Sequence, residues 1–362
     1  MIAGKDSSFR TLETNPPNGG AAVDRLIETV ITPMDQFFVR SHAPTPFVDL
    51  ETYRLTVVGE ITHEYSLTEL ASVAERVEMT ATLQCAGNRR VEMQQIAPIP
   101  GELIWDREAI STAIWSGFRL RDLLYDCGLT PEWSEANPNL HVWFEGLDQC
   151  EKDGEHFPFG GSIPLSKAFD PHVLLVDMMN GEYLLPDHGS PLRVFVPGYI
   201  GARSVKWVTR IFVREMPSDN YYQAHAYKLF APSVQPETVK WDDGLMLGEL
   251  SINSAIMQPN DGDTLPAGRM TIKGWAMSGG SGIARVDVSL DGGINWQTAA
   301  LYGDDLPFAW RLWALEVMLT PGEYQIVARA WDKAANTQPD HIIWNFKGYM
   351  NNVCPRARVI VK

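Results

Sequence analysis

The chain has 362 residues, 45% of them hydrophobic, and a formal net charge of -15 at pH 7. This length and apolar content can fill two hydrophobic cores, so we expect two domains. The negative charge argues against nucleic acid as a partner, because phosphates bind basic surfaces. No stretch of the sequence approaches the about 18 apolar residues of a membrane-spanning helix, so we expect no membrane span.

Residues 1–30 are polar and rich in Pro and Gly, which predicts an extended N-terminal arm with order beginning near Ile31. Residues 31–238 mix strand-like and helical patterns, as is typical of an α+β domain. We expect helices at 67–76 and 120–127, the second ended by Gly128. Strands are expected at 53–58, 173–177, 192–196 and 205–213.

Residues 239–362 consist of short alternating runs separated by turn signals about every ten residues, which indicates an all-β domain. The turn Asp291-Gly292-Gly293 favours a hairpin. Spacing and length predict a β-sandwich of immunoglobulin type. An adhesin for carbohydrate or protein is the non-enzyme alternative for this region. The expected strands are 270–275, 286–290, 324–331 and 357–361.

Cys85 is the most informative residue, because a turn and two arginines follow it in Cys85-Ala-Gly-Asn-Arg89-Arg90. A thiolate beside fixed positive charge is either a nucleophile or a soft metal ligand with an oxyanion bound next to it. The other cysteines show no zinc or haem-attachment spacing, so we interpret them as free thiols. They are Cys127, Cys150 and Cys354.

We weigh three functions for a reactive Cys85. The alternative is that Cys85 is a small buried thiol with arginines at the surface. A phosphatase loop needs an arginine six positions after the cysteine, and Val91 stands there. Acyl transfer needs a histidine base, but no local motif ties a candidate to Cys85. The third is ligation of a soft, high-valent metal, with Arg90 binding an anion. The candidate bases are His42, His141 and His188.

A second group of polar residues lies between positions 180 and 207, in Gly- and Pro-rich loops between apolar strands. Such loops bring backbone N–H groups and cations close to a phosphate. Their density in an otherwise acidic chain predicts a large anionic ligand. The residues are His188, Arg193, Arg203, Ser204 and Lys206.

From about Ile31 to the C-terminus, these motifs resemble the sulfite oxidase family of molybdopterin enzymes, which is related to eukaryotic nitrate reductase. Further shared motifs are Phe37-Phe-Val-Arg-Ser-His42, Phe144-Glu-Gly-Leu-Asp148, Asp187-His-Gly189, Gly201-Ala-Arg-Ser-Val-Lys-Trp207, Ala226-Tyr-Lys228, Val286-Asp-Val-Ser-Leu-Asp-Gly-Gly293 and Trp310-Arg-Leu-Trp313. A smaller relative that reduces methionine sulfoxide lacks the sandwich, so the length of this chain counts against it.

The resemblance implies one molybdopterin per chain, with molybdenum bound by its dithiolene and by the thiolate of Cys85. Asp148 would accept hydrogen bonds from pterin N–H groups, while His188, Arg193 and Lys206 would bind the terminal phosphate. The full set of cofactor-binding residues implied by motif is Phe38, Val39, Arg40, Ser41, His42, Asp148, His188, Arg193, Ser204, Val205 and Lys206.

The resemblance further implies oxidation of sulfite to sulfate by oxo transfer in a pocket formed by Arg40, Arg90, Trp105 and Tyr227. One position departs from the family pattern, because Lys347 stands where the family usually has arginine. Lysine keeps the charge but lacks the planar, two-pronged donor. Nitrate or another oxyanion, as substrate of a reductase, is therefore the alternative.

We expect no haem in this chain, because it shows neither a b5-like segment nor a CxxCH motif. Electrons would then pass singly to an external acceptor, a cytochrome or oxygen. The family's sandwich domain implies a homodimer. As the sequence stands, cytoplasmic localisation is expected, or periplasmic localisation if an export signal was removed.

Overall fold

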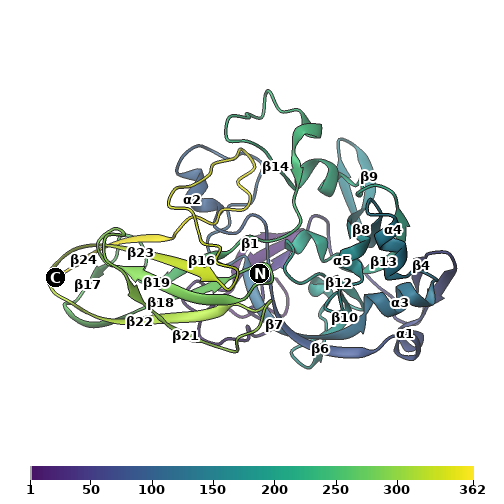
Figure 1. Ribbon diagram of the computed structural model, residues 1–362, viewed down its shortest axis with the longest axis horizontal. Coiled ribbons are helices and arrows are strands. Elements are labelled where there is room, and N and C mark those ends of the chain that lie inside the picture. Colours follow the sequence, from purple (N-terminus) through teal and green to yellow (C-terminus); the bar gives the residue numbers. More distant parts are fainter. Residues whose placement is uncertain (1) are drawn as a thin grey trace.

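Two five-stranded sheets form the framework of the N-terminal part in the computed structural model, which describes residues 2–362 (Figure 1). The first has the order β11-β10-β7-β6, with β12 paired to β10, and the second has the order β5-β4-β13-β8-β9. The strands are β4 (Leu55–Val58), β5 (Thr62–Tyr65), β6 (Arg76–Gln84), β7 (Ile110–Arg119), β8 (His141–Lys152), β9 (Glu155–Pro164), β10 (Leu174–Met179), β11 (Glu182–Tyr183), β12 (Arg193–Phe195) and β13 (Val208–Arg214).

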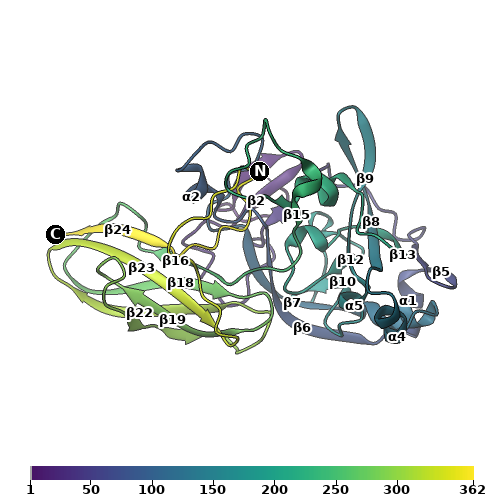
Figure 2. The same ribbon diagram turned by 45° about the horizontal axis from the view of Figure 1, so that its top comes forward.

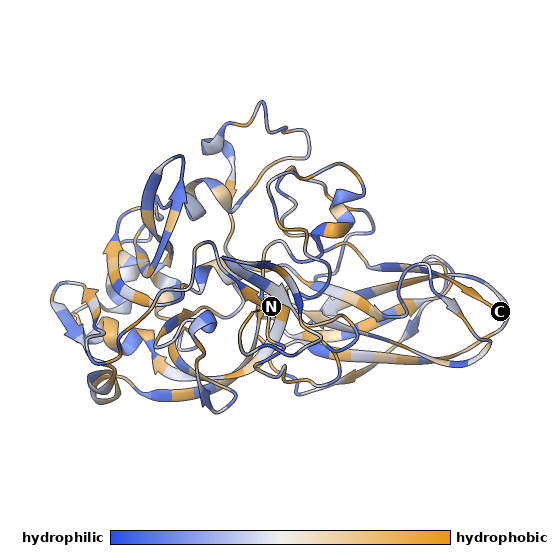
Figure 3. Cartoon of the chain, turned by 180° about the vertical axis from the view of Figure 1, so that it is seen from behind, coloured by the Kyte–Doolittle hydropathy of each residue, from blue (hydrophilic) through white to orange (hydrophobic). Residues whose placement is uncertain are grey.

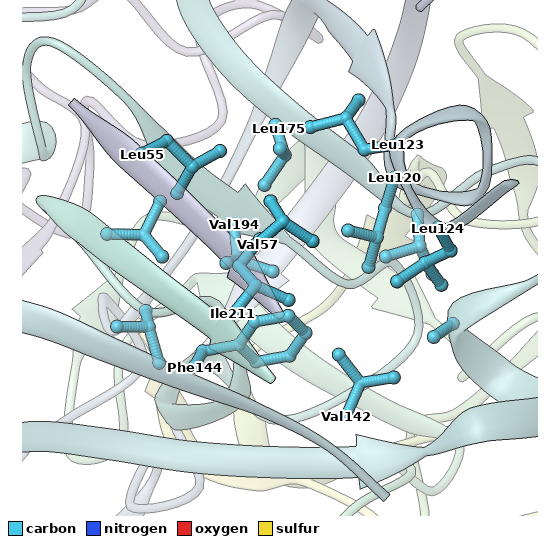
Figure 4. Packing of buried hydrophobic residues seen from close by; sticks show 14 of the residues in the cluster. Leu55, Val57, Leu120, Leu123, Leu124, Val142, Phe144, Leu175, Val194 and Ile211 are labelled. Atoms are coloured by element: carbon cyan, nitrogen blue, oxygen red, sulfur yellow. The ribbon is translucent and has the colours of Figure 1, made fainter. Parts of the chain in front are cut away.

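Alternation within the strands places one face of each sheet in a shared hydrophobic core (Figure 4). Leu55 and Val57 of β4 are fully buried, whereas Thr56 between them is only half-buried. Strands were expected at 53–58, 173–177, 192–196 and 205–213, and β4, β10, β12 and β13 confirm them with shifted ends.

Short helices flank the sheets. Helix α1 (Leu67–Val73) begins at Ser66, which forms a capping box with Glu69. The expected continuation to residue 76 is wrong, because Ala74 is extended and β6 pairs with β7 from Arg76 onward. Helix α3 (Leu120–Asp126) ends as expected before Gly128, whose φ is +80°. The other helices are α2 (Arg90–Gln94), α4 (Pro131–Ala136), α5 (Leu165–Ala168), the 3-10 turns η1 (Pro186–His188), η2 (Gly201–Arg203) and η4 (Trp241–Asp243), and the π-turn η3 (Tyr222–Ala226).

The N-terminal residues form a small sheet rather than a separate arm, so the expectation that order begins near Ile31 is wrong. Strand β2 lies between β1 and β3 in this sheet. Asn18 pairs across it with Arg40, which places the N-terminal segment against a predicted site residue. The strands are β1 (Arg10–Thr14), β2 (Pro17–Gly20) and β3 (Val39–Arg40).

The C-terminal part consists of two further sheets that enclose a second hydrophobic core (Figure 2). One has the order β16-β18-β22-β21 and the other β17-β24-β23-β19-β20. The strands are β16 (Asn253–Gln258), β17 (Thr264–Leu265), β18 (Gly268–Met277), β19 (Ile283–Ser289), β20 (Gln297–Thr298), β21 (Ala300–Tyr302), β22 (Arg311–Leu319), β23 (Gly322–Asp332) and β24 (Arg356–Val361).

The four strands expected in this region are confirmed as β18, β19, β23 and β24, and Asp291-Gly292-Gly293 lies in the β19–β20 turn. Figure 3 shows that hydrophobic stretches of both parts lie largely within strands, while the tip of the β8–β9 hairpin is hydrophilic. No helix within residues 2–362 is long and apolar enough to cross a membrane.

The two parts are joined by β14 (Lys228–Leu229) and β15 (Leu245–Met246) and by a buried arginine. The Arg89 guanidinium, with no exposed surface, donates to the Asn253 side chain and to the carbonyls of Ser254 and Val353 at 2.8–2.9 Å. Its charge is balanced by Glu92, 2.6 Å away. A shared hydrophobic cluster, which includes Ile110 and Trp275, completes the contact.

Replacing Arg89 by methionine should lower the free energy of unfolding by about 3–5 kcal/mol, because three buried acceptors and Glu92 would lose their cationic partner. Urea denaturation followed by tryptophan fluorescence measures this loss. The control is Arg358→Met, which removes an ion pair with Asp261 at 3.4 Å from a side chain that is 77% exposed. It should cost less than about 1 kcal/mol, and equal losses in the two variants would contradict the proposed role of Arg89.

Candidate active site

Cys85 follows β6 directly and lies at the wall of a buried pocket. Its backbone N–H donates to the Ala109 carbonyl at 2.9 Å, and the Gly87 N–H lies 3.5 Å from its Sγ. The Asn88 side chain accepts from the Ala109 N–H. These bonds fix the loop, so the thiol has a defined position at the end of the strand.

The pocket collects most of the predicted site residues from five separate segments of the chain. Twelve of them line it: Phe38, Val39, Arg40, Ser41, His42, Cys85, Asp148, His188, Arg193, Ser204, Lys206 and Tyr227. The remaining four, Arg90, Trp105, Val205 and Lys347, do not line it. The other lining residues are Leu83, Phe159, Asp187, Gly201 and Ala202.

One end of the pocket is cationic. Lys206 donates to the Ser41 hydroxyl and, at 2.9 Å, to the Asp187 carbonyl. Arg193 donates to the carbonyls of His188 and Ser204, each at 3.0 Å. The backbone around these side chains thus orients two cations toward one end of the pocket.

Burial opposes the charges at this end. It lowers the pKa of Lys206 to about 7, with Arg193 adding to the effect, and it lowers the pKa of Arg193 to about 9. The pKa of His188 is well below its usual range because of burial and the neighbouring Lys5. An anionic group bound here would restore the charged forms, since a nearby negative charge favours protonation.

Asp148, on β8, supplies the acceptor at this site. Burial raises its pKa to about 6, against the opposing effect of Lys206. Its Oδ1 has no hydrogen-bond partner among the described residues, and a Cβ at Gly146 would lie only 2.7 Å from that atom. The Nε of Arg193 is likewise buried without a partner there. A ligand with N–H donors and a phosphate would satisfy these groups, so the residues fit a molybdopterin.

Arg40, His42 and Tyr227 form another wall of the pocket. The Tyr227 hydroxyl and His42 Nε2 are 2.9 Å apart, and Arg40 donates to the Asn18 side chain at 3.1 Å. Burial, with Arg40 second, holds the pKa of His42 well below its usual range, so the imidazole is neutral. Burial also raises the pKa of Tyr227, which stays a phenol. Arg40 is then the charged group of this wall.

The four predicted residues outside the pocket lining have other contacts. Arg90 donates to the carbonyls of Leu103, Lys347 and Gly348. Trp105 is fully buried in the cluster that contains Cys85, and its indole N–H has no partner among residues 2–362. Val205 packs in the main core. Catalytic roles for Arg90, Trp105 and Lys347, and cofactor contact by Val205, stay predictions.

Sequence reasoning missed two groups at this site. Lys5 lies 2.8 Å from His188 Nε2 and donates to the Met34 and Phe37 carbonyls, although it comes from the supposed arm. No motif marks it. Asp187, Gly201 and Ala202 belong to motifs that the resemblance already used, so the signal for them was present but not applied to the individual residues.

Within residues 2–362, no three His, Cys, Asp or Glu side chains converge on a point where they could hold a metal ion.

Two family profiles match the chain. The profile described as "Oxidoreductase molybdopterin binding domain" matches residues 42–222, and that described as "Mo-co oxidoreductase dimerisation domain" matches residues 245–362. Each match lies inside one of the two domains expected from the sequence.

Relatives match over nearly the whole chain. Human mitochondrial sulfite oxidase is 45% identical over 371 residues, with 99% of this chain and 66% of the relative covered. Sulfite oxidase of Gallus gallus is 44% identical over 360 residues, with 96% and 77% covered. The chain thus spans about two thirds of the human protein's length. The nitrate reductase of Hordeum vulgare is 37% identical over 372 residues, but only 41% of it is covered.

The fold also matches a solved structure. The sulfane dehydrogenase SoxCD from Paracoccus pantotrophus gives a TM-score of 0.79 at 26% sequence identity, with 97% of this chain and 88% of that chain covered. The similarity therefore extends over both parts of the chain.

The lowered pKa of Lys206 predicts how the cofactor-free protein responds to pH. Unfolded lysine has a pKa near 10.5, so between about pH 7 and that value the unfolded chain binds a proton that folded Lys206 has lost. The contribution of Lys206 to the free energy of unfolding therefore rises with pH in this window. Lys206→Met should reduce the rise in unfolding free energy, measured by urea denaturation from about pH 7.5 to 9, by about 1 kcal/mol per pH unit. Lys152→Met, at a half-exposed position, is the control, and equal slopes in all three proteins would contradict the prediction.

Proposed function

Because this chain belongs to the sulfite oxidase family of molybdopterin oxidoreductases, we propose that it oxidises sulfite to sulfate at a molybdenum–molybdopterin centre. The observation that carries the proposal is that one pocket contains the Cys85 thiol, a cationic end and the half-buried side chain of Arg40. When bound, the cofactor would supply oxygen-atom transfer and accept two electrons. The single electrons would then leave to an external acceptor.

In this proposal the protein binds the cofactor at both ends. Cys85 is the one metal ligand from the chain, and thiolate sulfur suits a soft, high-valent metal. Asp148 accepts from pterin N–H groups through its unpartnered oxygen. Lys206, Arg193 and His188 bind the phosphate, and Lys5 orients the His188 ring through the 2.8 Å contact.

The wall with Arg40 and Tyr227 would bind the substrate. A small oxyanion loses its hydration on entering a buried pocket, and fixed charged donors replace that hydration. Arg40 supplies charge, and the Tyr227 hydroxyl supplies a donor whose position is set by neutral His42.

Nitrate is the second candidate substrate, and Lys347 is the observation that favours it. Its ammonium forms an ion pair with Glu102 and is half-buried, so it is not a freely solvated surface lysine. A lysine binds an oxyanion with less directionality than an arginine. The greater similarity to sulfite oxidases over a larger share of their length favours sulfite.

Sulfite-dependent reduction of ferricyanide under anaerobic conditions, by molybdenum-loaded protein, tests the proposed activity. Cys85→Ser should lower the rate by more than about 100-fold, since loss of a group that merely orients a metal ligand already costs about 10- to 100-fold. Cys354→Ser is the matched control, because this buried thiol lies in the C-terminal part. A loaded wild-type protein that does not turn over sulfite would contradict the proposal and direct the assay to nitrate.

The C-terminal part is proposed to be an immunoglobulin-like sandwich that forms a homodimer, which agrees with the matched dimerisation domain over residues 245–362. Light scattering coupled to size exclusion should give twice the 40.5 kDa mass of one chain. A monomeric mass at micromolar concentration would contradict the proposed homodimer.

The external acceptor is proposed to be a cytochrome, because the net charge of -15 attracts a basic partner over distance. With cytochrome c as acceptor, turnover should fall several-fold as salt rises from about 0.01 to 0.2 M. The reason is that the screening length falls from about 30 Å at 0.01 M to less than about 10 Å at 0.2 M. Ferricyanide is an anion and should not show this fall. A rate with cytochrome c that does not change with salt concentration would contradict this proposal, and oxygen would then be the acceptor to test.

A further inference from the structure

The carboxylate of Glu102 lies between two cations that sequence reasoning assigned to the substrate. Its Oε2 is 3.3 Å from the Arg90 guanidinium, and its Oε1 forms an ion pair with the Lys347 ammonium. The Tyr349 hydroxyl lies 3.4 Å from Oε2. Neither cation has a second carboxylate partner among the described residues. Glu102 is therefore the counter-ion of both.

This cluster adjoins the thiol. A Cβ placed on Gly87 would lie 2.6 Å from an Arg90 guanidinium nitrogen, so the guanidinium packs directly against the glycine whose N–H approaches Cys85 Sγ. A larger residue at position 87 would therefore displace Arg90. The charge of Arg90 is thus held within a few ångströms of the Cys85 loop.

Aromatic rings link the same cluster to the substrate wall. The Arg90 guanidinium lies 4.9 Å from the centre of the Tyr349 ring, and that ring stacks on Tyr227 with centroids 5.2 Å apart. Tyr227 lines the pocket. The ion pairs of Glu102 therefore lie one ring beyond the pocket wall.

Two segments far apart in sequence form this cluster. The segment between α2 and β7 lies beside the segment between β23 and β24, as Figures 1 and 2 both show. The ion pair of Glu102 with Lys347 joins these two segments. The Lys347 side chain is 17% exposed and Glu102 12%, whereas Arg90 is 2% exposed. Exposure thus decreases along the cluster from Lys347 through Glu102 to Arg90.

The formal charges of the three cations assigned to the substrate, together with that of Glu102, can be added. Arg40, Arg90 and Lys347 carry three positive charges, and Glu102 reduces the net formal charge to two. That net charge equals the charge of a sulfate dianion and has the opposite sign. A carboxylate is also a planar oxyanion, so it uses the same N–H donors that a substrate oxyanion would use.

We propose that Glu102 competes internally with the oxyanion for Arg90 and Lys347 and thereby lowers the affinity of the site for oxyanions. The carboxylate occupies both cations when no oxyanion is bound, and it yields them to the substrate. This competition weakens binding of sulfite and of sulfate alike, which allows the product to leave. The proposal rests on the proposed function for the identity of the oxyanion.

The test is Glu102→Gln in the molybdenum-loaded protein, which removes the charge but keeps the shape. Isothermal titration calorimetry with sodium sulfate should show affinity that is about tenfold higher than in the wild type, equal to about 1.4 kcal/mol. The KM for sulfite should fall in the same proportion. Glu75→Gln is the matched control, because it removes one carboxylate from an exposed ion pair with Arg119. It should leave sulfate affinity unchanged.

Weaker sulfate binding in Glu102→Gln would show that the carboxylate only positions the two cations, and it would overturn the proposal. Unchanged binding, including binding too weak to detect in every variant, would overturn it as well. Glu102→Asp keeps the charge, so its sulfate affinity should stay nearer to wild type than to Glu102→Gln. Equal tightening in both variants would also contradict a role for charge.

The calorimetric result separates this proposal from the proposed function. If the wild type fails to turn over sulfite while Glu102→Gln still tightens sulfate binding, the proposed substrate is wrong and the role of Glu102 stands. If the wild type turns over sulfite and Glu102→Gln leaves sulfate affinity unchanged, the proposed substrate stands and the proposed role of Glu102 is wrong.

Discussion

The buried guanidinium of Arg89 is the constraint on which the arrangement of the site depends. Arg89 has a left-handed backbone conformation, with φ of 64°, directly after the loop that carries Cys85. Its side chain binds Asn253, Ser254 and Val353 of the C-terminal part. A charge without exposed surface needs full hydrogen bonding to be tolerated. The C-terminal part therefore determines where the thiol loop lies, in addition to any role in dimer formation.

The pocket itself is costly to fold. It gathers Lys5, Arg193 and Lys206 where burial lowers the pKa of each, and it leaves an oxygen of Asp148 without a partner in the described chain. Groups that oppose folding in this way are retained where a ligand supplies the missing charge and donors. Cofactor binding and stability should accordingly be linked, because the ligand binds the folded form alone.

The acidic composition and the cationic site are compatible because the site is small and buried. The excess of acidic over basic residues sets the overall charge at -15, whereas the few cations inside the pocket act strongly on a bound anion because the surrounding medium has low polarity. Glu102 extends the same principle inward. It balances the charges of Arg90 and Lys347 one aromatic ring beyond the pocket wall formed by Tyr227.

The sequence by itself determined the local units: the Cys85 loop, the 187–206 cations, and strands such as β4 and β19, because each depends on neighbouring residues or on a simple alternation. It misjudged α1, where pairing of β6 with β7 ends the helix, and it missed the N-terminal sheet. Only the tertiary structure placed Lys5 against His188, 183 positions away, and Glu102 between Arg90 and Lys347. Such contacts carry no local signal, because they arise when separate segments of the chain pack together.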